Sequence, residues 1–262
     1  MIRHPLPRTL DHMAEARILV VQPSEDTPAG RLDDWLGEAG AELDVLDPTR
    51  ETLPETLDEH SGLVVLDAET SATADLQCPW LGRLRTLLSS ATGAGTPVLA
   101  IGFGAHVLAM ATGGRIGTRS HGPEAGTLLV AKRDAAAEDV LLGPLPLTPD
   151  VFQFHREEIT TLPPTAQLLA ASPGGENQAF RVGDRAYGLQ FHIETTPGIV
   201  RRMLASEPDV AAVVRPGQLD EEHLERFHAD LEETWKPVAE RFVRMAATPP
   251  EERAGTRSLP LL

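Results

Sequence analysis

Short apolar runs that alternate with helix-like segments constrain the fold of this chain more than any other feature. The runs are about as long as buried strands, and each is followed by apolar residues at helical spacing. Strands that alternate with helices favour a parallel sheet connected by right-handed crossovers. The strand-like runs lie at 17–23, 62–69 and 97–102, with an edge-strand pattern at 42–48. The helix-like segments lie at 30–41, 79–95 and 104–112.

The pattern changes after residue 120, where strand-like segments follow one another with tight turns. This succession predicts an antiparallel β insertion whose last strand, 186–192, returns to the main sheet. A helix at 196–206, with Pro197 near its start, closes this part of the chain. The strand-like segments of this region are 126–134, 150–159, 166–172, 178–184 and 185–194.

The C-terminal part is helical in character. Apolar residues recur every three or four positions from Leu224 to Met245, which predicts one amphipathic helix or two helices that meet at Pro237. We favour a helix packed on its own domain, and a homodimer face through 220–246 is the alternative. His223 and His228 are expected to face solvent. The predicted organisation is an N-terminal extension at 1–15, a domain at 16–206, and a C-terminal helical extension and tail at 207–262.

Composition excludes several classes of function. The 262 residues are 41% hydrophobic, enough for one sizeable core, and carry a formal net charge of −16. This charge disfavours binding to nucleic acid and to anionic membrane surfaces. The single cysteine rules out an internal disulfide and a multi-cysteine zinc site. Since no secretory signal or membrane-spanning run is recognisable, a cytoplasmic protein is expected.

Two motifs connect the chain to a known family. The sequence PVLAIGFGAH at 97–106 places a strand directly before a helix, and LQFHIE at 189–194 follows much later. Together they resemble the nucleophile elbow and the distant Q-F-H-x-E motif of class I glutamine amidotransferases. FQFHREE at 152–158 resembles a histidine-containing strand of a stand-alone branch of that family. The resemblance covers about residues 16–206 and implies a flavodoxin-like, doubly wound α/β fold with the antiparallel insertion described above.

The resemblance also implies a catalytic arrangement that this chain lacks in part. In that family a cysteine at the elbow attacks the glutamine amide, a histidine acts as its base, and a glutamate orients the histidine. His192 and Glu194 occupy the last two positions, and their spacing places both side chains on one side of an extended segment. The nucleophile position, however, holds Gly102, which has no reactive atom.

A second departure concerns the oxyanion site. The family usually has a glycine-rich loop there, but this chain continues from Leu66 into Asp67, Ala68 and Glu69. Carboxylates next to a developing oxyanion raise its energy, and loss of one oxyanion donor already costs about 3 kcal/mol. Two separate parts of the acyl-transfer machinery are therefore missing together.

Other residues suggest a new use of the pocket. His106 lies one helical turn after Gly102 and on the same face, where the family has glutamine. The missing cysteine side chain is expected to leave a space for a ligand. His106 and His192 with nearby carboxylates could ligate a metal ion, one imidazole could ligate a haem, or the set could act in acid–base chemistry. We favour an inert, packed arrangement of these residues over a metal or haem site. The candidate ligand-binding residues are Asp67, Glu69, Phe103, His106 and His155.

Three hypotheses for function follow. The first is a glutamine amidotransferase-like pseudoenzyme without glutaminase activity, whose pocket binds a small molecule, metal or haem and supports a new reaction in a specialised pathway. The second is an inactive scaffold or regulatory subunit that binds a protein partner. The third is a residual amidase or glutaminase that uses Cys78, which lies before a predicted helix start.

Overall fold

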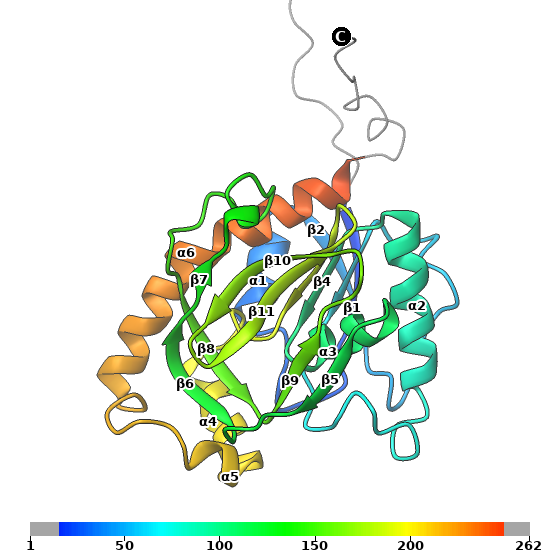
Figure 1. Ribbon diagram of the computed structural model, residues 1–262. Helices are drawn as coiled ribbons and strands as arrows, with labels where there is room; N and C mark the ends of the chain where they lie inside the picture. Colours follow the sequence, from blue (N-terminus) through cyan, green and yellow to red (C-terminus); the bar gives the residue numbers. More distant parts are fainter. Residues whose placement is uncertain (1–15, 249–262) are drawn as a thin grey trace, which may run out of the picture.

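An eight-stranded mixed sheet forms the centre of the molecule, which is known from a computed structural model that describes residues 16–248 (Figure 1). The strand order is β2-β1-β3-β4-β12-β11-β10-β7, and the first five strands are parallel. The predicted extension at 1–15 lies outside the described residues, as do residues 249–262 of the predicted C-terminal extension and tail at 207–262. The parallel strands are β1 (Ala16–Val21), β2 (Ala41–Leu46), β3 (Gly62–Val65), β4 (Val98–Ile101) and β12 (Ala186–Leu189). The antiparallel strands are β7 (Ala131–Lys132), β10 (Ala166–Ser172) and β11 (Gly175–Val182).

Two antiparallel ribbons complete the β insertion. β5 (Arg115–Thr118) pairs with β9 (Glu157–Thr161), and β6 (Glu124–Leu129) pairs with β8 (Asp150–His155). The prediction of one continuous strand at 150–159 is wrong, because the chain changes its pairing partner at Arg156 and enters a different ribbon. The predicted strand at 126–134 is divided in the same way between β6 and β7. Local apolar alternation continues through both breaks, so only the long-range pairing reveals them.

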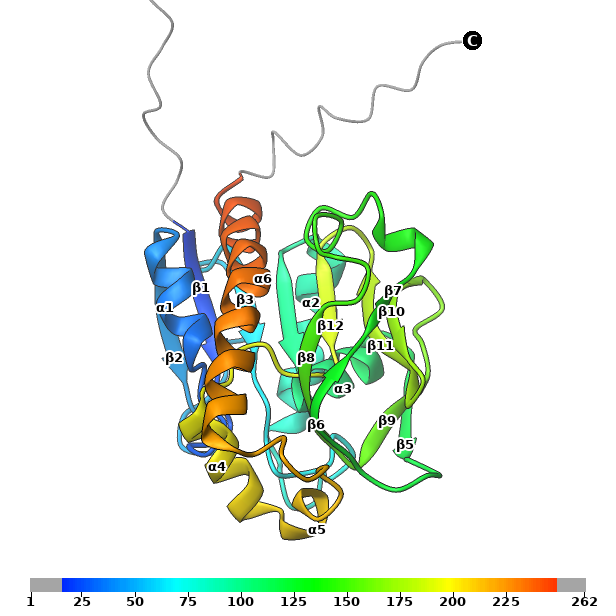
Figure 2. The same ribbon diagram turned by 90° about the vertical axis from the view of Figure 1, so that its left-hand side faces the viewer.

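Helices cover both faces of the parallel sheet, and alternate strand residues face one layer or the other. Val20 and Leu99 belong to a core shared with α1 and α6, whereas Val21 and Val98 pack with α2 and α3. Figure 2 shows α1 and α6 side by side, in agreement with their contacts. The helices are α1 (Arg31–Glu38), α2 (Leu81–Ala94), α3 (Phe103–Ala111), α4 (Pro197–Ser206), α5 (Pro208–Ala211) and α6 (Glu221–Ala247), with a short 3-10 helix at Asp134–Ala136.

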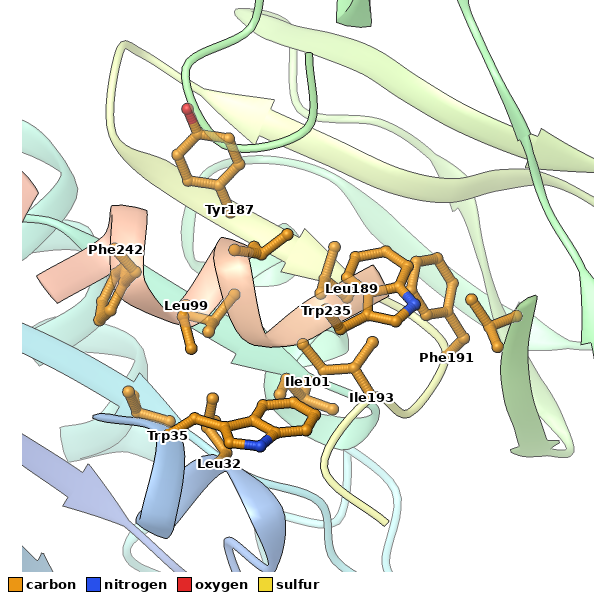
Figure 3. Close-up of a cluster of buried hydrophobic side chains, with 14 of the residues drawn as sticks. Leu32, Trp35, Leu99, Ile101, Tyr187, Leu189, Phe191, Ile193, Trp235 and Phe242 are labelled. Atoms are coloured by element: carbon orange, nitrogen blue, oxygen red, sulfur yellow. The ribbon is translucent and has the colours of Figure 1, made fainter. Parts of the chain in front are cut away.

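The C-terminal helix α6 packs on its own domain, as the sequence analysis favoured. It is a single helix that continues through Pro237. Trp235 and Phe242 are fully buried and meet strand residues such as Leu99 and Leu189 in the same core (Figure 3). The apolar residues on which the homodimer alternative relied are therefore buried within the chain. None of the helices formed by residues 16–248 is long and apolar enough to cross a membrane.

The prediction that His228 faces solvent is wrong. His228 lies on the buried face of α6. Its Nδ1 donates a hydrogen bond to the Leu224 carbonyl of the same helix, and its Nε2 lies 3.2 Å from Thr195 Oγ1. This contact links α6 to the segment that carries Glu194. Helical spacing alone placed His228 away from His223 but could not show which face of the helix is covered.

Candidate functional site

The sharp turn between β4 and α3 has glycine, Gly102, at the point where the strand ends and the helix begins. Gly102 adopts φ 56° and ψ −120°, a conformation that strains residues with a side chain. Its amide donates to the Leu189 carbonyl of β12 at 2.9 Å, and α3 begins at the next residue. The turn is therefore fixed between two central strands, at the carboxyl edge of the sheet where ligands bind in open α/β folds.

Asp67 fills the space in front of Gly102. A Cβ atom added to Gly102 would overlap Asp67 Oδ1 and lie 2.8 Å from Asp67 Cγ. The same oxygen accepts a hydrogen bond of 2.6 Å from the backbone amide of Phe103, and Thr27 Oγ1 donates to the Asp67 carbonyl at 2.9 Å. The expectation that the missing cysteine leaves an open space is therefore wrong, because a carboxylate from the β3 loop occupies it.

His192 and Glu194 form the hydrogen-bonded pair that their spacing predicts. His192 Nδ1 donates to Glu194 Oε1 at 2.7 Å, and the amide of Ile193 donates to Glu194 Oε2 at 2.8 Å. His192 itself is held by two backbone hydrogen bonds with Phe152 of β8, and both members of the pair are buried. On the other side of the ring, Nε2 lies 3.9 Å from Asp67 Oδ2 and has no hydrogen-bond partner.

The N-terminus of α1 packs against the backbone of Glu194 and helps to hold the His192–Glu194 pair. Gly30, with φ 53°, brings the α1 N-terminus onto the Glu194 carbonyl, which accepts a hydrogen bond of 2.9 Å from the Arg31 amide. A Cβ atom on Gly30 would overlap that carbonyl oxygen and come close to Ile199. A side chain at position 30 would consequently displace the backbone that orients Glu194.

Burial and neighbouring charges shift the pKa values of His192 and Asp67. Burial lowers the pKa of His192, but the charge and hydrogen bond of Glu194 and the charge of Asp67 outweigh it and raise that pKa to about 9. Burial raises the pKa of Asp67 to about 6, although the charge of His192 and the Phe103 amide oppose this. At neutral pH the site therefore holds a protonated His192 between two carboxylates.

A cleft of about 240 Å³ opens beside the elbow. Its walls are formed by loop 67–71, the first turn of α3, residues 154–157 and Glu207. All five ligand-binding candidates from the sequence analysis line it, whereas His192 and Glu194 are buried behind Asp67. The candidate ligand-binding residues that line the cleft are Asp67, Glu69, Phe103, His106 and His155.

The sequence analysis missed Phe154, Arg156, Glu157 and Glu207 as cleft residues. Glu157 lies two residues after His155, so the motif FQFHREE contained a usable signal for it. Glu207 follows α4, and only the packing of the helix end against Arg156 brings it to the cleft.

His106 lines the cleft and has a buried ring nitrogen without a hydrogen-bond partner. Its side chain is 5% exposed, and Nε2 has no hydrogen-bond partner. Burial lowers the pKa of His106 to about 3; the neighbouring imidazoles of His155 and His192 add to the effect, and a side-chain hydrogen bond with Gln190 opposes it. His155 is fully engaged, since Nδ1 donates to the Glu157 carbonyl at 2.8 Å and Nε2 lies 3.0 Å from Gln153 Oε1. His106 is therefore the neutral imidazole of the cleft.

Similarity to known proteins shows the family of this chain. A family model described as glutamine amidotransferase class-I matches residues 31–207. The chain belongs to the class I glutamine amidotransferase family. The match ends before α6, so the long C-terminal helix lies outside the region that defines the family.

Relatives within the family differ in length and activity. Gamma-glutamyl peptidase 4 of Arabidopsis thaliana is 23% identical over 219 residues, which are 80% of this chain and 84% of that protein. A glutamine-hydrolysing GMP synthase of Aeropyrum pernix is 36% identical over 100 residues, which are 38% of this chain but only 19% of the synthase. The chain thus spans a small part of the GMP synthase and most of the peptidase.

Solved structures share the whole fold. A glutamine amidotransferase from Thermotoga maritima superimposes with a TM-score of 0.77 at 27% identity, over 88% of this chain and 99% of that one. A glutamine amidotransferase from Methylobacillus flagellatus gives a TM-score of 0.75 at 24% identity, over 88% and 95% of the two chains. The mainly parallel sheet and its flanking helices are therefore those of a class I amidotransferase.

The alternatives involving metal and cysteine receive little support from the geometry. Among residues 16–248 no group of three or more histidine, cysteine, aspartate and glutamate side chains is placed to hold a metal ion. Cys78 is partly buried with Sγ 3.7 Å from Thr70 Oγ1, and Thr70 lines the cleft whereas Cys78 does not. Neither a two-histidine metal centre nor a cysteine beside His192 is assembled in this part of the chain.

Proposed function

We propose that this protein is a class I glutamine amidotransferase relative that does not hydrolyse glutamine and whose former catalytic cleft binds a small molecule. The observation that carries the proposal is the position of Asp67. Its carboxylate lies where the side chain of a nucleophile at position 102 would begin, and it accepts the hydrogen bond of the Phe103 amide.

Both requirements of acyl transfer are affected by this one side chain. A covalent mechanism needs a nucleophile within reach of its base, but the group facing His192 is a carboxylate rather than a thiol. A tetrahedral intermediate needs free donors for its oxyanion, but the amide that begins α3 already donates to Asp67. The His192–Glu194 pair is retained, and its protonated form balances the charge of Asp67.

Introducing a cysteine at position 102, with and without removal of the Asp67 carboxylate, tests the proposal. The wild-type protein is expected to release no ammonia from L-glutamine in a coupled glutamate dehydrogenase assay. Gly102→Cys alone is expected to restore little activity, because Asp67 still occupies the site. The double variant Gly102→Cys/Asp67→Gly frees the Phe103 amide and should exceed the single variant. Robust turnover by the wild type, or by Gly102→Cys alone, would overturn the proposal.

The amidase alternative has a specific comparison behind it, since relatives include a gamma-glutamyl peptidase and glutamine-hydrolysing synthases. If the chain cleaves such amides through Cys78, the activity should disappear in Cys78→Ser. The scaffold alternative stays a prediction as well. It requires a partner whose binding is lost when residues outside the cleft are changed.

A further inference from the structure

The cleft beside the elbow carries more negative charge than its neighbours balance. Glu69 Oε1 accepts a hydrogen bond of 3.0 Å from Ser24 Oγ, and Glu157 Oε1 accepts one of 2.8 Å from Ser71 Oγ. Within residues 16–248, neither carboxylate has a lysine, arginine or histidine nitrogen within 4.0 Å. Hydroxyl groups hold both side chains in place without cancelling their charge.

The cations near the cleft already have partners. Arg156 lies on the cleft wall but pairs with Glu207 and with Asp209, the latter at 2.6 Å. The charge of His192 is shared between Glu194 and Asp67. Glu69 and Glu157 are therefore free to interact with a positively charged ligand.

His106 provides an independent sign of a ligand. It is a neutral imidazole on the cleft wall, and its buried Nε2 has no partner. Buried polar atoms in folded proteins are nearly always hydrogen-bonded, so an unpartnered one beside a cleft indicates a missing partner. As the neutral tautomer with Nε2 unprotonated, the ring can accept a hydrogen bond from an ammonium group.

The apolar parts of the wall favour an organic ligand over a bare metal ion. Phe103 and Phe154 line the cleft between the acidic groups and can cover a hydrocarbon stem or the face of a cation. The volume of about 240 Å³ suits a metabolite-sized molecule. The net charge of −16 would also attract cations to the protein surface.

We propose that the cleft binds a small organic ammonium compound, whose charged nitrogen contacts Glu69, Glu157 and His106 and whose hydrocarbon part packs against Phe103 and Phe154. This inference rests on the proposed function, because a site used for glutamine hydrolysis would have to admit a neutral amide at the elbow. The acidic groups instead favour a ligand whose charge is positive at neutral pH.

Isothermal titration calorimetry with defined probes tests this assignment. The cationic probes are 1,4-diaminobutane, spermidine and agmatine, and the matched controls are neutral 1,4-butanediol, anionic glutarate and Mg²⁺. At least one cationic probe is expected to bind with a stoichiometry of one and to weaken as salt is added. Saturable binding of none of the cations, or equal binding of 1,4-butanediol, would overturn the proposal. Binding of Mg²⁺ alone would overturn it too.

Charge-neutral variants locate the binding. Glu69→Gln and Glu157→Gln are each expected to lower the affinity for the cationic probe by roughly tenfold or more, which is the effect of losing one charged hydrogen bond. Glu233→Gln removes the same charge from an exposed position on α6 and should leave the affinity unchanged. His106→Phe should weaken binding while keeping a ring in the cleft. Circular dichroism shows whether each variant is folded.

Two outcomes separate this inference from the proposed function. If the variants in the cleft and Glu233→Gln weaken binding equally, the cations only screen the surface charge and the inference fails. Ammonia release from L-glutamine is measured on the same wild-type preparation. Glutamine turnover contradicts the proposed function, whereas absence of both turnover and cation binding contradicts only the ligand class.

Discussion

Replacement of Gly102 by alanine should reveal how strongly Asp67 occupies the space in front of Gly102. The change places a Cβ atom against Asp67 Oδ1 and 3.1 Å from His192 Cε1. Two costs are expected. The positive φ of 56° strains an alanine by about 1–3 kcal/mol, and displacement of Asp67 from the Phe103 amide costs about 1.5–3 kcal/mol. Together they predict a loss of about 4 kcal/mol in the free energy of unfolding.

A double-mutant cycle separates the two costs. In an Asp67→Gly background the carboxylate is absent, so Gly102→Ala should cost only the backbone strain. The coupling energy between the two positions is therefore expected to be about 1.5–3 kcal/mol. Gly183→Ala is the matched control, because Gly183 has φ 59° with nothing within 4 Å of an added Cβ.

Urea unfolding followed by tryptophan fluorescence measures these energies, since Trp35 and Trp235 are buried in the core. A coupling energy below about 0.5 kcal/mol, the usual limit of additivity, would contradict the placement of Asp67 in front of the elbow. A Gly183→Ala variant as unstable as Gly102→Ala would show that the strain alone accounts for the loss.

Three further predictions concern the buried pair, the C-terminal helix and a helix cap. The pKa of His192 is raised from 6.5 to about 9 on folding, so its contribution of about 3 kcal/mol is present below pH 6.5 and is lost as the pH rises through 9. His192→Gln should therefore flatten the dependence of the free energy of unfolding on pH between pH 6.5 and 9.5, as measured by urea titration. An unchanged slope would contradict this. Asp67 has a pKa of about 6, which lies below that window. Trp235→Ala should lower the free energy of unfolding by about 3–5 kcal/mol, because the ring is buried against Phe191 at 5.4 Å between centroids; a loss under 1 kcal/mol would mean that α6 is not docked as described. Thr196→Ala should cost about 1 kcal/mol in the same assay, since Thr196 Oγ1 caps α4 by accepting from the Ile199 amide, whereas Thr196→Ser should be nearly neutral.

The sequence carried clear information about the parts of the fold that local patterns encode. The buried strands at 17–23 and 97–102, and the helices that follow them, appear within a few residues of their predicted bounds. The His192–Glu194 hydrogen bond was accessible because both residues lie on one extended segment. Gly102 could be identified as the empty position of the elbow because the flanking motif is contiguous.

Side-chain positions set by distant parts of the chain were not accessible. Asp67 was recognised as a residue near the oxyanion site, but only the packing of the β3 loop against α3 places its carboxylate on the Phe103 amide. The void that the glycine predicted there is absent, because the Asp67 carboxylate fills the space in front of Gly102. Glu207 reaches the cleft through its ion pair with Arg156, which is far away in the chain.

The sequence by itself determined a mainly parallel α/β sheet with a glycine at its elbow, because apolar periodicity and a contiguous motif depend on neighbouring residues. Only the tertiary structure decided that the Asp67 carboxylate lies against Gly102, that His106 Nε2 has no hydrogen-bond partner, and that α6 buries His228. These features depend on which segments meet across the sheet, and that is a property of packing between residues far apart in the chain.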